Sequence, residues 1–238
     1  MRTRAAATAI IAATAVVAQA GCDGGGHDDA PKAGSSPARS SASASPSPSV
    51  RYTAEQLKRA LVEPPARATN VKSESGTADT VLSRLGEPGP SATVTTAPGC
   101  PAYGPAGRGA VGRTPVAFLS FSRDEMFFTV LLSASSDART SRFVTQALPK
   151  ACRSFKTNAG GTATTATIVA DDPYAIGEGG RVRETDETSS GVRLRVWEVA
   201  FVGAGYFASC QVGGLNATRA EAERLARQTY RKAGATLH

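Results

Sequence analysis

The apolar positions after residue 51 first follow the three-and-four spacing of a helix. Thr53 can cap that helix while Gln56 reaches back to it, which is the pattern of a capping box, and Pro64-Pro65 ends it. A second short helix is expected from about Thr77 to Gly86, a favourable residue just past a helix end. The apolar stripe of the first helix consists of Leu57, Ala60 and Leu61, and that of the second of Val81, Leu82 and Leu85.

The same spacing returns twice further along the chain. Ser135 or Ser136 is expected to cap a helix that Pro149 ends or kinks. Thr218 and Glu221 form a second capping box, which opens a C-terminal helix. The stripe of the earlier helix is Thr140, Phe143, Val144, Ala147 and Leu148, and that of the later one is Ala222, Leu225, Ala226, Thr229 and Ala233.

Runs rich in Val, Ile, Phe and Thr, bounded by turn residues, predict strands. Arg123-Asp124-Glu125 separates two such runs, which should form a hairpin, and Thr188-Ser189-Ser190 joins another antiparallel pair. A polar loop is expected to hold Asp171-Asp172 and the glycines of 177–180. The expected strands are 92–96, 115–122, 126–133, 162–170, 181–187, 191–202 and 206–212. This order of elements predicts an α+β fold, a single antiparallel β-sheet domain with packed helices.

The strand 191–202 has two different faces, because side chains alternate along a strand. One face carries Val192, Leu194 and Val196. The other is polar at its start and apolar at its end, as where a helix or loop covers part of a sheet. If the domain has a ligand cleft, we expect it on this second face of the strand, lined by Trp197, Val199 and Phe201. Arg193 and Arg195 would then lie at the rim of the cleft and attract an anionic group.

The N-terminal 21 residues have the parts of a secretory signal: Arg2 and Arg4, an apolar run, and small residues at its end. The segment 16–22 resembles a bacterial lipobox, in which Cys22 becomes lipidated and is the first residue of the mature chain. Gln19 departs from that pattern, since leucine is commonest there. The alternative is a plain secretory signal that is cut after Ala20.

Residues 22–50 are rich in Ser, Ala and Pro and should form a disordered tether, with a mean reach of roughly 30 Å. His27-Asp28-Asp29 fixes no geometry for a metal there, so we expect no metal site in the tether. The glycines of 177–180 lack the Lys and the helix start of a phosphate loop, and with no metal spacing elsewhere we expect neither a metal nor a cofactor. Residues 51–238 have the composition of one globular domain.

Charge adds a preference for anionic surroundings. The chain has 27 Lys and Arg against 20 Asp and Glu, a net of +7, and without Arg2 and Arg4 the mature chain has 25 against 20. A mildly basic surface suits anionic lipids or wall polymers. The cations form no run and do not alternate with aromatic residues, so we expect no nucleic-acid partner.

Histidine limits the chemistry further. The only two are His27 and His238, so a Ser-His-Asp or Cys-His catalyst and a histidine-rich zinc site are not expected in the folded core. Hydrolysis by paired carboxylates remains an alternative. We expect the candidate acids to be solvated charges of a hairpin region; they are Asp171, Asp172, Glu178, Asp186 and Glu187.

The mature chain would keep three further cysteines, which allow one internal bridge. Cys100 lies in a turn and Cys152 just past a helix end, where the backbone can adjust to disulfide geometry. Cys210 alternates with Ala208 and Val212 in a strand, so we expect a buried free thiol. The sequence therefore predicts a Cys100–Cys152 disulfide.

The run Tyr52–Leu61 after a Ser/Pro tether resembles the start of many actinobacterial lipoproteins. The later order of Cys100, a strand pair, a helix with Phe143 and Ala147, Cys152, more strands and a C-terminal helix resembles the extracellular sensor-type domain of PknH-type kinases and its lipoprotein relatives. This resemblance implies an α+β sheet domain with a ligand cleft and no established catalytic residues. The family often has two disulfides, whereas three cysteines allow one.

We therefore predict a monomeric lipoprotein, anchored through acylated Cys22 on the extracytoplasmic face of the cell membrane. Its domain should bind a ligand without catalysis, the ligand being a lipid, a wall polymer or an envelope protein. The alternatives are a structural lipoprotein that docks on an envelope protein and, less favoured, a carboxylate-dependent wall hydrolase.

Overall fold

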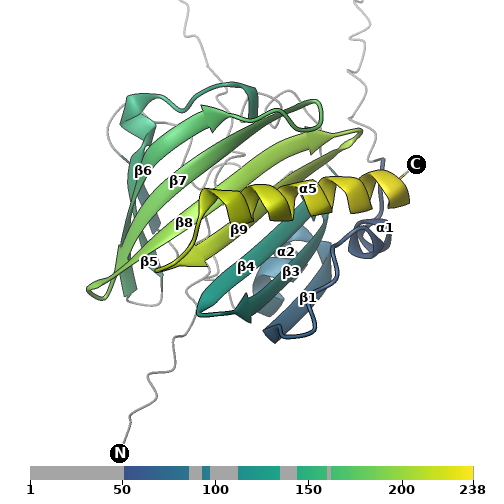
Figure 1. Ribbon diagram of the computed structural model, residues 1–238, viewed down its shortest axis with the longest axis horizontal. Helices are drawn as coiled ribbons and strands as arrows, with labels where there is room; N and C mark the ends of the chain where they lie inside the picture. Colours follow the sequence, from purple (N-terminus) through teal and green to yellow (C-terminus); the bar gives the residue numbers. More distant parts are fainter. Residues whose placement is uncertain (1–50, 86–92, 97–111, 135–143, 160–161, 238) are drawn as a thin grey trace, which may run out of the picture.

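The computed structural model describes residues 51–85, 93–96, 112–134, 144–159 and 162–237. They form one antiparallel sheet in the strand order β1-β3-β4-β9-β8-β7-β6-β5-β2 (Figure 1). The α+β class with a single antiparallel sheet is confirmed. The strands are β1 Thr69–Thr77, β2 Thr93–Thr96, β3 Pro115–Arg123, β4 Met126–Ser133, β5 Ser154–Ala159, β6 Thr162–Pro173, β7 Gly179–Ser189, β8 Val192–Gly203 and β9 Tyr206–Gly214.

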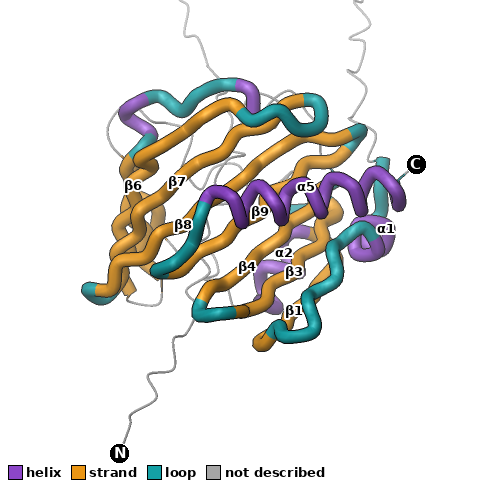
Figure 2. The backbone as a smooth tube through the Cα atoms, in the orientation of Figure 1, coloured by secondary structure: helices purple, strands orange, loops and turns teal. Residues whose placement is uncertain are grey.

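Helices cover the two faces of this sheet differently. The long helix α5, Arg219–Thr236, crosses the centre of one face, which we term the first face, and the short helix α1, Ala54–Arg59, packs beside it (Figure 2). The opposite, second face carries α2, Ala78–Leu85, over its β1–β3 end. The main core lies between the sheet and the two helices of the first face.

Both caps form, although only one is the complete capping box that the sequence predicts. Thr53 Oγ1 accepts a hydrogen bond from the Gln56 N–H, and the Gln56 side chain accepts one from the Thr53 N–H. At α5, Thr218 Oγ1 accepts from the Glu221 N–H. The Glu221 carboxylate pairs with Arg123 at 3.3 Å instead of closing the box. The predicted stripe of α5 is confirmed, since Ala222, Leu225, Ala226, Thr229 and Ala233 are all buried.

The predicted polar loop around Asp171-Asp172 is wrong. Both residues lie in β6, where Asp171 is opposite Arg183 of β7 and Asp172 is opposite Val182. Two acids in succession look like loop residues, but the arginines that neutralise Asp171 are on the next strand. The loop is therefore shorter than expected, from Tyr174 to Glu178.

Two strands, β1 and β5, were not expected. The β1 sequence is polar and its side chains are mostly exposed, because it is an edge strand, so it lacks the alternation that marks β3 and β4.

The predicted helix before Pro149 lies mostly outside the described residues. Its described end is helical only at Val144 and Thr145, earlier than expected. The Leu148 N–H donates to the carboxylate of Asp171 at 2.6 Å, so it does not continue the helix.

The signal segment, the tether, Cys22 and Cys100 lie outside the described residues, and the expectations for them remain predictions. Among the described residues no helix is both long enough and apolar enough to cross a membrane.

Candidate functional site

A row of six buried polar residues crosses the second face of the sheet from β3 to β6. Their backbones are directly paired, one strand after the next, so the side chains lie side by side at the same level of the sheet. We term these residues the polar row: Ser120, Thr129, Gln211, Glu198, Arg183 and Asp171.

The surroundings of the polar row are apolar. Val116 and Phe118 pack on α2 toward one end of the strands, and Ala200, Val202 and Phe207 form a second cluster with Val144. On the other side of the row, the Phe127 ring lies against Gly213, where an added Cβ would approach a ring carbon to 2.0 Å. Burying polar groups in such surroundings costs free energy unless they are paired. The polar row therefore lowers the stability of the sheet wherever one of its groups lacks a partner.

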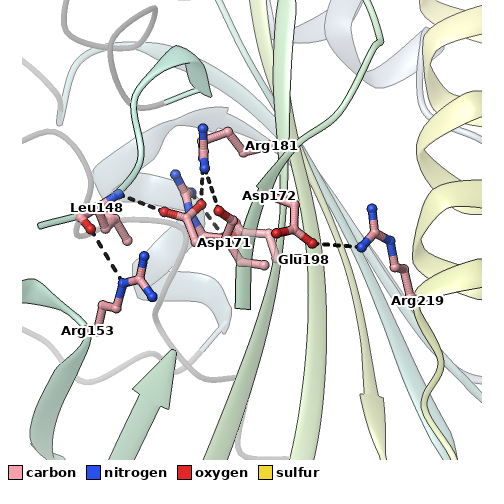
Figure 3. Close-up of polar contacts among 8 residues, drawn as sticks. Leu148, Arg153, Asp171, Asp172, Arg181, Glu198 and Arg219 are labelled. Carbon is pink, nitrogen blue, oxygen red and sulfur yellow. Dashed lines mark hydrogen bonds and ion pairs between the residues drawn. The ribbon is translucent and has the colours of Figure 1, made fainter. Parts of the chain in front are cut away.

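At the β6 end, two guanidinium groups converge on one carboxylate (Figure 3). Arg181 Nε donates to Asp171 Oδ1 at 2.6 Å, and Arg183 Nε donates to the same oxygen at 3.1 Å. Arg181 also donates to the Asp171 carbonyl, and the Leu148 N–H binds the second carboxylate oxygen. The Asp171 side chain has no solvent exposure.

This environment sets the charge of Asp171. Burial by itself would raise the pKa of the carboxyl. The hydrogen bonds from Arg181 and Leu148 and the positive charges of Arg183 and Arg181 outweigh burial, so the pKa of Asp171 lies below its ordinary value. Asp171 is therefore an ionised anchor for two buried cations.

The middle of the row is also bonded internally. Glu198 Oε1 accepts a hydrogen bond from Ser209 Oγ at 2.7 Å, and its other oxygen lies 3.8 Å from Arg183. Thr129 differs, because its buried hydroxyl has no hydrogen-bond partner. A buried hydroxyl without a partner has the potential to bind a group that the chain does not supply.

A second unsatisfied group lies further along β7 on the same face. Glu187 is 4 % exposed and one of its carboxylate oxygens has no partner. It is opposite Ala166 of β6 and Leu194 of β8. Burial raises the pKa of Glu187 to about 7. The hydroxyl of Ser189, two residues on, is likewise buried without a partner.

These carboxyl groups do not form a catalytic pair. Asp171 is opposite Arg183, and Glu187 lies four residues beyond Arg183, which corresponds to about 13 Å along a strand. Paired carboxylates that hydrolyse glycosides lie about 5 to 9.5 Å apart. The expectation that the acids are solvated is wrong for Asp171 and Glu187, which are buried. Among the described residues, no group of three or more potential ligands could hold a metal ion.

The residues predicted to line a ligand cleft are divided between the surface and the core. Arg193 pairs with Asp186, and Arg195 Nε lies 2.9 Å from Glu184; both arginines are exposed. Val199 and Phe201 are fully buried in the main core, and Trp197 packs against it. The Phe201 ring meets the ring of Tyr230 of α5 edge to face. A ligand at these five residues remains a prediction, and packing under α5 already accounts for the two buried ones.

Two of the cysteines are described, and they agree with the prediction that Cys210 is a free thiol and Cys152 is bridged. Cys210 is a free, buried thiol that donates to Thr229 Oγ1 at 3.4 Å. Burial is the main cause that raises its pKa, to about 12. Cys152 is buried and disulfide-bonded. The pairing of Cys152 with Cys100 remains a prediction, because Cys100 lies outside the described residues.

The polar row itself was missed by the sequence reading. Arg181 and Arg183 alternate with Val182, which is visible in the sequence, but the same pattern also suits an exposed strand face. Six single positions on six strands become a row only once the register is known.

No protein-family model and no curated protein matches the chain. Among solved structures, the extracellular domain of PknH from Mycobacterium tuberculosis is similar, with a TM-score of 0.52 and 10 % identity over 78 % of this chain and 98 % of that one. A putative uncharacterized protein from Mycobacterium smegmatis, the Rv0999 ortholog, has a TM-score of 0.36 and 12 % identity over 68 % and 96 %. The first similarity confirms the sheet architecture that the sequence resemblance implied.

Proposed function

We propose that this chain is an extracytoplasmic, lipid-anchored binding protein with a sensor-like, non-catalytic domain. The observation that carries the binding function is the polar row. A sheet face that served packing alone would be stabilised by apolar side chains, because a buried ion pair is on balance no better than a well-packed apolar pair. Charged, amide and hydroxyl side chains on six consecutive strands suit the recognition of a polar ligand.

The location follows from the N-terminal sequence and is supported by the fold. The segment ending at Cys22 has the pattern of a lipoprotein signal, and the similar PknH domain is extracellular. Diacylated Cys22 would hold the chain in the membrane, since two acyl chains anchor a protein stably where one does not. Replacing Cys22 by Ala should move the protein from the membrane fraction to the medium. Wild type and Cys22→Ala protein found equally in the membrane fraction would contradict the anchor.

Thr129 offers a direct test of ligand binding. Its hydroxyl has no internal partner, so Thr129→Val removes no hydrogen bond of the chain and should leave the fold intact. Native mass spectrometry of gently extracted wild type should detect a bound polar molecule, and Thr129→Val should lose it. The matched control is Thr188→Val, the same change at an exposed position of β7. Wild type without bound mass, or equal retention by Thr129→Val, would contradict a ligand on the polar row.

A further inference from the structure

The outward face of α5 has a charge pattern that its packing does not require. Arg224, Arg227 and Arg231 are spaced three and four residues apart and therefore share one side of the helix. That side is opposite the buried stripe of Ala222, Leu225, Ala226, Thr229 and Ala233. All three arginines are exposed. We term them the arginine stripe.

Neighbouring acids neutralise this face only in part. Glu221 is shared by Arg123 and Arg224, and Glu223 is shared by Arg219 and Arg227. The helix carries five cations, with Lys232 the fifth, and two acids. Two acids outside the helix add to these, since Asp172 pairs with Arg219 and Glu63 lies 3.7 Å from Lys232. Among the described residues, the three exposed arginines of the stripe thus share only Glu221 and Glu223 with other cations, which leaves a surplus of positive charge toward solvent. Exposed ion pairs of this kind contribute little to stability, so the stripe is not explained by the fold.

The turn before α5 adds a feature that suits a lipid surface. Leu215, four residues before the helix, is 74 % exposed. Leucine is among the apolar residues that enter the boundary between headgroups and acyl chains. The first described residues lead into α1, which begins at Ala54 and packs beside α5 on the same side of the sheet.

We propose that the arginine stripe docks the domain on the anionic phospholipid surface of the membrane. The inference rests on the proposed anchor for its setting, since about 28 tether residues keep the domain within roughly 30 Å of the headgroups. Attraction between exposed charges acts only over about 8 to 10 Å in physiological salt. The stripe therefore selects which side of the tethered domain faces the lipid, and it leaves the second face of the sheet turned away from the membrane.

Vesicle binding tests the stripe without relying on the anchor. Purified full-length Cys22→Ala protein, which carries no acyl chain, should sediment with phosphatidylcholine vesicles only when these contain phosphatidylglycerol. Each arginine near an anionic surface strengthens partitioning by about fivefold. Changing Arg224, Arg227 and Arg231 together to Gln should thus weaken binding by about a hundredfold. Added salt should weaken the binding of the parent protein.

The matched control removes the same charge elsewhere. Arg84, Lys150 and Lys156 are exposed and lie on α2, in the short helix η5 (Lys150–Cys152) and on β5, away from α5. Changing these three to Gln should weaken binding by less than about fivefold. Equal loss in both triple variants, or equal binding to vesicles without phosphatidylglycerol, would overturn the proposal. Failure of the anchor would appear separately, in the fractionation of wild type against Cys22→Ala protein.

Discussion

Strand β9 lies in the interior of the sheet, between β4 and β8, and is buried along its whole length, yet its two sides have different chemistry. On the first face, Ala208, Cys210 and Val212 pack into the main core under α5. On the second face, Ser209 and Gln211 lie among charged neighbours of the polar row. Equal burial thus has two different origins in one strand.

The first face stabilises the fold through apolar packing, whereas the second face carries the polar groups that are candidates for function. Apolar burial contributes about 25 cal/mol per Å² without any directional requirement, so the first face stabilises the sheet directly. The second face has to satisfy each charge by geometry. Its stability depends on a few ion pairs and hydrogen bonds, which explains why single substitutions should act so unequally on the two faces.

The largest effect is expected at Asp171. Asp171→Ala leaves the buried guanidinium groups of Arg181 and Arg183 without their shared carboxylate. Breaking a buried pair from one side costs about 4 kcal/mol in the free energy of unfolding. Denaturant unfolding should measure this loss. The adjacent Asp172→Ala removes a half-exposed pair with Arg219 and should cost less than about 1 kcal/mol. Similar losses of unfolding free energy in the two variants would contradict the claim that the second face depends on the buried ion pairs of the polar row.

Glu187 should make stability depend on pH in the opposite sense from Asp171. The pKa of Glu187 is raised from 4.5 to about 7 in the folded chain, so above pH 4.5 the unfolded chain loses this proton first. Stability contributed by neutral Glu187 is complete below pH 4.5 and falls as the pH rises to about 7, by about 3 kcal/mol in total. Glu187→Gln should abolish this fall, as measured by unfolding across that range. An unchanged pH profile in Glu187→Gln would show that another group titrates.

Asp171 gives the reverse sign. Its pKa is lowered by folding, so its contribution is present above its ordinary value of 3.8 and is lost as the pH falls through the folded pKa. The two carboxyl groups of one sheet face therefore act in separate pH windows.

The smallest effect is expected for a neutral polar contact in the middle of the first face, between Cys210 and Thr229. Thr229→Val removes the hydroxyl that accepts a hydrogen bond from Cys210 while keeping the side-chain volume. The expected cost is about 1 kcal/mol or less in the free energy of unfolding. A loss as large as that of Asp171→Ala would mean that the first face also depends on polar pairing.

Sequence patterns predict the first face well and the second face poorly, for a physical reason. The stripe of α5 and the hairpin of β3 and β4 follow the periods of helix and strand, so local spacing is sufficient to find them. Edge strand β1 buries few side chains and has no such period. The polar row depends on contacts between strands as distant in sequence as β3 and β6, so no local pattern contains it.

The two ends of the sheet decide whether copies of this protein can add to one another. An edge strand offers unpaired backbone groups that can recruit a strand from another chain and start aggregation. At one end lies β2, of which Thr93–Thr96 are described. At the other, β1 is polar, its register shifts between Thr69 and Lys72, and Asn70 has a φ of 52°. A kinked, charged strand is a poor template, so the sheet resists growth into fibrils at the β1 margin.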